Sequence, residues 1–157
     1  MDSMKRKSIF LIMIVALLLS QHLLFADDDF NEFATRIYKK DIKGVEELLA
    51  KGVDVNIREK TMGSTPLIVA CSLEGTYEIV ELLISKGADI NIQGSYDGRT
   101  ALMFASSNGK LDLVKYLLSK KADVHLKAKD GTTALSLAIK DKNDEIIKIL
   151  KVNGAKE

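Results

Sequence analysis

Residues 65–91 read TPLIVACSLEGTYEIVELLISKGADIN, and residues 100–125 repeat the same layout as TALMFASSNGKLDLVKYLLSKKADVH. In both stretches a Thr opens a short apolar segment, a Gly interrupts it, and a Leu-Leu pair precedes Ala-Asp. Leu-Leu pairs begin at Leu48, Leu82 and Leu117, which sets a period of 34 to 35 residues. A period of this length is typical of a solenoid, in which each unit buries its apolar face only against its neighbours.

The sequence of each repeat predicts two short helices followed by a projecting turn. In the third unit the Thr100 hydroxyl can cap the first helix, and Gly109 ends it. The second helix carries apolar residues at the spacing of one helical face: Leu111, Val114, Leu117 and Leu118. The dipeptides Asp97-Gly98 and Asp130-Gly131 predict tight turns, so the connecting segments are expected to form hairpin-like fingers that lie side by side.

The pattern resembles the ankyrin repeat family, most closely from Gly63-x-Thr65-Pro66-Leu67 to Gly87-Ala88-Asp89-Ile90-Asn91. The resemblance implies an all-α solenoid of about four ankyrin repeats within residues 27–157, at roughly 30–59, 60–93, 94–127 and 128–157. Where a histidine commonly follows Thr-Pro-Leu in the family, this chain has Ile68, Met103 and Ser136, which removes a polar brace between fingers and helices. The second repeat carries one extra residue before Gly75, and the first two fingers are one residue longer than the third.

Both ends of the predicted stack look like caps. The apolar residues Phe30, Phe33, Ala34 and Ile37 form one helical face, which predicts a capping first helix. In the last unit Asp144 and Lys151 stand where the preceding unit has leucines, so the outer face there is expected to be polar.

The first 26 residues have the layout of a secretory signal. Lys5-Arg6-Lys7 precede an apolar run from Ile9 to Leu19, and an acidic run follows Ala26. We therefore expect a signal peptide at residues 1–26 and an exported protein of bacterial type, in the periplasm or secreted. The alternative is an uncleaved membrane anchor, because residues 8–26 number 19, close to the roughly 20 that span a bilayer.

The charge balance and the cysteine content limit which partners and which stabilising bonds the chain can have. The chain has 23 Lys and Arg against 22 Asp and Glu, and cleavage after Ala26 removes three basic and one acidic residue, leaving 20 against 21. This balance gives no bulk electrostatic argument for nucleic acid or for an anionic membrane surface. The single cysteine, Cys71, excludes an intramolecular disulfide, so stacking alone must stabilise the fold.

Catalytic and metal sites are not expected. His125 would be the only histidine of the cleaved chain, and it stands where Asn91 of the preceding repeat is expected to brace the finger. Cys71 falls in a packed helix, where a free cysteine behaves as a buried apolar residue. The chain lacks the His and Cys content of a zinc site and a glycine-rich phosphate loop after a strand, so no cofactor is expected. An enzyme that uses finger carboxylates is the remote alternative.

The resemblance implies that finger tips and the exposed edges of the first helices bind a protein partner. The residues at those positions that we predict to bind the partner are Met62, Ser64, Leu73, Tyr96, Asp97, Arg99, Asn108, Lys129 and Lys140. Among these we favour Met62, Leu73, Tyr96 and Arg99, since methionine, aromatic residues and arginine are enriched in interface cores. We expect a monomeric, non-catalytic protein-interaction module, with a membrane-tethered scaffold as the alternative if the N-terminal segment is retained.

Overall fold

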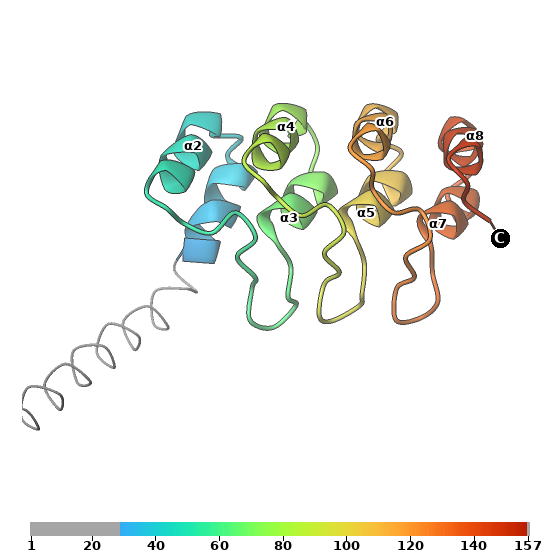
Figure 1. The fold of residues 1–157 in the computed structure, drawn as a ribbon, viewed down its shortest axis with the longest axis horizontal. Coiled ribbons are helices and arrows are strands. Elements are labelled where there is room, and N and C mark those ends of the chain that lie inside the picture. The colour runs from blue at the N-terminus through green and yellow to red at the C-terminus, as the bar shows by residue number, and fades with distance from the viewer. Residues whose placement is uncertain (1–28, 157) are drawn as a thin grey trace, which may run out of the picture.

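The structure is a computed structural model that describes residues 29–156. Within this range the helices form four successive pairs: residues 29–38 with α2 (Ile42–Ala50), α3 (Pro66–Ser72) with α4 (Tyr77–Ser85), α5 (Ala101–Ser107) with α6 (Leu111–Ser119), and α7 (Ala134–Lys140) with α8 (Asp144–Val152). The pairs lie side by side in one row, with α2, α4, α6 and α8 forming an outer layer (Figure 1). No strand occurs between residues 29 and 156. The prediction of an all-α solenoid is confirmed.

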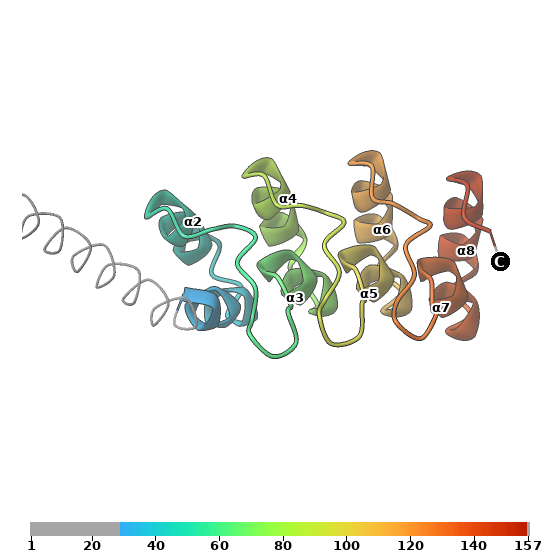
Figure 2. The ribbon, with the colours of Figure 1, turned by 60° about the horizontal axis from the view of Figure 1, so that its bottom comes forward.

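Three loops project from the helices and form a third layer. They occupy residues 53–65, 88–100 and 122–133, and each leads into the first helix of the next pair. Figure 2 shows that the three loops project on the same side of the molecule, next to α3, α5 and α7. These loops are the fingers predicted from the sequence, and together they are called the finger row below.

The first helix of each inner pair begins in the same way. Thr65, Thr100 and Thr133 precede the helices in extended conformation, and their hydroxyls accept hydrogen bonds from the N–H three residues later, at 3.3, 3.3 and 3.1 Å. At Thr133 the arrangement is reciprocal, because its N–H donates to the Ser136 hydroxyl at 2.8 Å. The predicted cap at Thr100 is therefore confirmed, and the same chemistry repeats in the units on both sides.

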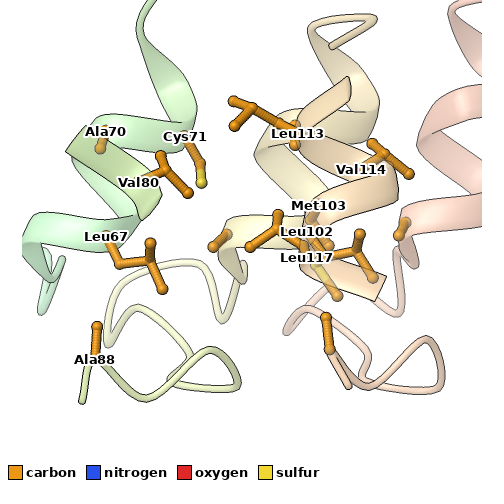
Figure 3. Packing of buried hydrophobic residues seen from close by; sticks show 14 of the residues in the cluster. Leu67, Ala70, Cys71, Val80, Ala88, Leu102, Met103, Leu113, Val114 and Leu117 are labelled. Carbon is orange, nitrogen blue, oxygen red and sulfur yellow. The ribbon is translucent and has the colours of Figure 1, made fainter. Parts of the chain in front are cut away.

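The core runs continuously through the stack, and part of it is drawn in Figure 3. The predicted apolar face of the second helix, α6, is confirmed at Val114 and Leu117, whereas Leu111 and Leu118 are only partly buried against the core. In the preceding pair Leu83 is fully buried and Leu82 is only partly covered. In α6 the buried residues are Leu113, Val114 and Leu117. An outer helix touches its own partner across one narrow stripe, so the flanking leucines keep one side exposed to solvent.

The positions that lack the family histidine are filled in two ways. Ile68 and Met103 are 3% and 1% exposed and add to the apolar core. Ser136 instead takes part in the reciprocal cap at the start of α7. Apolar packing thus occupies two of the three sites where the resemblance implied a polar brace.

The extra residue of the second repeat lies at the end of α3. Leu73 there is extended, with φ of −102° and ψ of 152°. Lys110 of the next repeat reaches back and donates to the carbonyl oxygens of Cys71, at 3.2 Å, and of Leu73. One repeat further on, Asn143 donates in the same way to the Ser106 carbonyl at 3.2 Å. Polar side chains before α6 and α8 therefore tie the last two pairs to the pair before each.

The terminal units match the predicted caps in their burial. Phe30, Phe33 and Ile37 are 6%, 0% and 0% exposed, as expected for a stripe that packs on the stack. Asp144 and Lys151 are exposed. The predicted signal at residues 1–26 lies outside the described residues, and within residues 29–156 no helix is both long enough and apolar enough to cross a membrane.

Candidate partner-binding surface

Backbone hydrogen bonds join neighbouring fingers. The N–H of Tyr96 in the second finger donates to the carbonyl of Met62 in the first at 3.1 Å. The N–H of Lys129 in the third finger donates to the carbonyl of Asp97 in the second at 2.8 Å. The fingers therefore lie edge to edge, as predicted, and their tips are held in a fixed register.

A second set of bonds links the fingers through side chains at one repeated position. Arg58 Nη2 donates to the Gln93 carbonyl at 2.6 Å, and Gln93 Nε2 donates to the Lys127 carbonyl at 2.8 Å. These residues are 35 and 34 positions apart, so they occupy equivalent places in successive fingers. The repeat spacing of long polar side chains was the signal that could have revealed these links from the sequence.

Asparagines brace the base of two fingers. The Asp89 N–H donates to Asn56 Oδ1 at 2.8 Å, and the Asp123 N–H donates to Asn91 Oδ1 at 2.9 Å. The bracing role expected at the Asn91 position is therefore confirmed. His125 occupies the equivalent place one repeat later, where it is exposed and its ring makes no such bond to any residue that the structure describes.

Finger length decides how each tip closes. In the second finger the Gly98 N–H donates to the Gly94 carbonyl at 2.9 Å, which closes a turn of five residues, and the first finger closes in the same way. In the shorter third finger the Gly131 N–H donates to the Ala128 carbonyl at 2.9 Å, which closes a turn of four residues. The additional residue thus widens the tip without changing how the fingers align.

The finger carboxylates bind groups of their own turns. Glu59 accepts from the Thr61 hydroxyl at 2.6 Å and from its N–H at 2.8 Å, and these bonds lower the pKa of Glu59. Asp97 and Asp130 each accept from the N–H two residues later, at 2.9 Å. Hydrogen bonds from Thr132 lower the pKa of Asp130. The acidic side chains of the fingers therefore act mainly as local turn stabilisers.

Three of the predicted binding residues lie together at the finger tips. Met62 and Tyr96 are 48% and 70% exposed, and the bond between their backbones makes them neighbours. Lys129 is also exposed and follows on the third finger. An exposed methionine beside an exposed tyrosine offers a partner a small apolar contact area within a polar surface.

Other predicted residues in the fingers are partly engaged within the chain. Arg99 forms an ion pair with Asp97, with 3.7 Å between Nε and Oδ2, and its guanidinium lies 6.0 Å from the centre of the Phe104 ring. Ser64 is half-buried, and its carbonyl accepts a bond from the N–H of Glu59 at 2.9 Å. These residues make contacts within the fingers, and their remaining polar atoms are available to a partner.

The remaining predicted residues form a separate group at the far ends of the first helices. Leu73 is partly buried against the core. Asn108 is exposed, and its Nδ2 donates to the Ser72 carbonyl at 3.0 Å. Lys140 is exposed in the last turn of α7. Since the fingers join the opposite ends of these helices, a partner must lie along the helices to reach both groups.

Residues 29–156 offer few groups that could bind a metal or act as a catalytic nucleophile. This range holds no group of three or more His, Cys, Asp or Glu residues placed to bind a metal. Cys71 is completely buried, and burial raises the pKa of its thiol to about 12, so the thiolate that would act as a nucleophile is suppressed. A groove of about 410 Å³ lies between the α3–α4 and α5–α6 turns, but its Lys110 and Glu74 pair with each other at 3.6 Å.

Known proteins share this repeat. The rat Ankyrin repeat and SAM domain-containing protein 6 is 44% identical over 90 residues, which are 56% of this chain and 10% of that protein. The Serine/threonine-protein kinase 12 of Arabidopsis thaliana is 35% identical over 116 residues, which are 74% of this chain and 17% of that protein. Alpha-latrocrustotoxin-Lt1a of Latrodectus tredecimguttatus is 32% identical over 105 residues, 67% of this chain and 7% of the toxin.

The chain spans no more than 17% of the length of these three relatives. All three come from eukaryotes, so they do not support the predicted bacterial source. A sequence profile described as "Ankyrin repeats (3 copies)" matches residues 33–94 and 75–156, which together cover nearly all of the described helices and fingers. The chain belongs to the ankyrin repeat family.

Proposed function

We propose that this chain is a non-catalytic module that binds a partner protein through the finger row and the adjoining edges of α3, α5 and α7. Ankyrin repeats generally bind protein partners, and the family is typically non-catalytic. The observation that carries the proposal is the pairing of Met62 and Tyr96, whose backbones are bonded while their side chains stay exposed. Exposed methionine and aromatic side chains in a fixed arrangement are typical of interface cores.

The way in which the fingers are held supports tight recognition. Each finger is bonded to the next through its backbone and through the Arg58 and Gln93 side chains. A surface that is already ordered loses little conformational freedom when a partner docks, so more of the contact energy appears as affinity. The proposed mechanism is therefore presentation of a preformed surface.

The test is affinity capture with the full chain from cells that express it. A variant with Met62→Ser and Tyr96→Ser removes the tip contact, and a variant with Tyr38→Ser and Val152→Ser removes two exposed side chains outside the finger row, which are 65% and 80% exposed. The wild type and the second variant are expected to retain the same partner, and the first variant to lose it while keeping its circular dichroism spectrum. Equal capture by both variants would contradict the proposal.

We further propose that the protein is exported after removal of residues 1–26. The basic start, the apolar run from Ile9 to Leu19 and the acidic residues after Ala26 support this proposal. The alternative is an uncleaved anchor, which would present the same finger row from a membrane surface. N-terminal sequencing of protein from expressing cells separates the two. Export predicts Asp27 as the first residue, and a tether predicts an intact N-terminus in the membrane fraction.

A further inference from the structure

Two basic side chains from the outer fingers reach the same residue of the middle finger. Arg58 Nη2 donates to Ser95 Oγ at 3.2 Å from one side. Lys129 Nζ donates to the Ser95 carbonyl oxygen from the other. Ser95 is exposed and neutral, so two cations converge at the surface on a residue that cannot neutralise them.

The acidic residues at the finger tips form their contacts elsewhere and do not pair with these two cations. Glu59 and Asp130 bind groups in their own turns, and Asp97 pairs with Arg99. Arg58 and Lys129 form no ion pair with any residue between 29 and 156. Lys127 is also exposed, and its ammonium makes no hydrogen bond or ion pair to the described part of the chain. The finger tips therefore present positive charge that a partner can neutralise.

Charge is distributed unevenly between the layers even though the whole chain is nearly neutral. The tip segments of the fingers, residues 57–64, 92–99 and 126–132, hold five basic and three acidic residues, whereas the finger bases carry Asp54, Asp89 and Asp123 and no Lys or Arg. The outer helices α2, α4, α6 and α8 hold four basic and seven acidic residues. A partner steered by this difference would approach the finger tips with its negative face.

We propose that the partner docks through an acidic, extended segment rich in Asp and Glu, whose carboxylates bind Arg58 and Lys129 on either side of Ser95. This inference rests on the proposed function and specifies the partner. Tyr96 directly follows Ser95 and neighbours Met62, so an apolar side chain of the same segment can contact the tips while its carboxylates bind the cations. Arginine suits this role because its guanidinium binds a carboxylate through two parallel bonds.

A nucleic acid fits the same surface less well. Tyr96 is the one aromatic residue in the three finger segments, which leaves no row of stacking platforms for bases. Few uncompensated cations are available, and non-specific nucleic-acid binding depends on many phosphate contacts. The observations therefore favour an acidic protein segment.

The test uses fluorescence anisotropy with the full chain and a labelled peptide of alternating glutamate and serine that contains one phenylalanine. R58E/K129E reverses the converging cations, and K43E/K115E makes the same change in net charge on exposed positions of α2 and α6. The finger variant is expected to bind the peptide at least about tenfold more weakly, and the helix variant to change affinity less than about threefold. Binding by the wild type is expected to weaken as salt rises.

Two further variants keep the test decisive. If R58E/K129E fails to fold, K127E replaces it, because the exposed Lys127 side chain forms no hydrogen bond or ion pair with the described residues. It is expected to weaken peptide binding by about threefold. Replacing the peptide phenylalanine by serine is expected to weaken binding to the wild type but not to Y96S. If the wild type and Y96S lose the same affinity for the peptide, the proposed contact between the peptide phenylalanine and Tyr96 is contradicted.

Three results would overturn the acidic-segment inference. These are equal binding of a peptide with glutamine in place of glutamate, equal loss in the two double charge-reversal variants, and tighter binding of an oligodeoxythymidylate of the same charge. If any of them occurs while capture still depends on Met62 and Tyr96, the inference fails and the proposed function stands. If capture is also independent of those residues, both fail.

Discussion

The helix layer and the finger row join their repeats by different forces. Among the helices, side chains such as Leu83 and Leu117 are fully buried between units. Between fingers, the links are hydrogen bonds among groups at or near the surface, such as those of Gln93. A buried leucine is worth about 2 to 5 kcal/mol and a neutral hydrogen bond about 0.5 to 1.5 kcal/mol. Stability therefore resides mainly in the helices, which leaves the finger side chains available for recognition.

The largest expected effect separates the two leucines of one pair. Leu83→Ala is expected to lower the free energy of unfolding by about 2 to 5 kcal/mol, because it leaves a cavity in the core. Leu82→Ala is expected to cost about 1 kcal/mol, because that side chain is only partly covered. Urea denaturation of both variants measures the difference. Equal costs, or a cost below about 0.5 kcal/mol for Leu83→Ala, would contradict the packing described here.

The next effect concerns how closely the fingers approach one another. Gly63 and Gly131 both have positive φ, at 62° and 83°, so alanine is strained at either position. At Gly63 an added Cβ would also lie 2.6 Å from the Ser95 backbone nitrogen, whereas at Gly131 no heavy atom lies within 4 Å. We expect Gly63→Ala to destabilise the protein by about 1 to 3 kcal/mol more than Gly131→Ala. Thermal unfolding measures this, and equal losses would mean that the fingers are not packed together.

A smaller effect is expected from the side-chain links between fingers. Gln93 Nε2 donates to the carbonyls of Gly98, at 2.7 Å, and Lys127, at 2.8 Å. Gln93→Ala should therefore cost about 1 to 2 kcal/mol and speed amide exchange in the second and third fingers. Lys127→Ala, at the equivalent position of the third finger, is the matched control and should leave both quantities nearly unchanged. Unaltered exchange in Gln93→Ala would show that the backbone bonds alone hold the row.

The smallest effect depends on pH. Hydrogen bonds lower the pKa of Glu59 in the folded state, so the stabilisation is present above the usual pKa of a carboxyl group and is lost as pH falls through the lowered value. Glu59→Gln should therefore lower the melting temperature slightly at neutral pH, and the gap to wild type should close in acid. Glu46→Gln, on an exposed face of α2, is the control. A gap that persists in acid would contradict the role given to the carboxylate charge.

Features that depend on neighbouring residues could be predicted from the sequence. The Thr100 cap involves an N–H three residues away, and the stripe of Phe30, Phe33 and Ile37 lies within two helical turns. The choice between Leu82 and Leu83 could not be made in the same way. Both residues are apolar, and only the contact with a neighbouring helix decides which one is buried.

The candidate surface was predictable only in part for the same reason. Exposed tip residues such as Met62 and Tyr96 follow from the repeat pattern. The convergence of Arg58 and Lys129 on Ser95 does not, because it depends on how three separate fingers align across 34 and 37 residues of chain. Lys110 likewise reaches carbonyls 37 and 39 residues away.

The central claim is that the finger row, and not the outer helix layer, contacts the partner. The most direct measurement is crosslinking in cells with a photoreactive residue in place of Tyr96 on the second finger or of Tyr77 on α4, which is 37% exposed. The account predicts a defined crosslinked species from position 96 and none from position 77. A species that forms at position 77 alone, or equally at both positions, would contradict it.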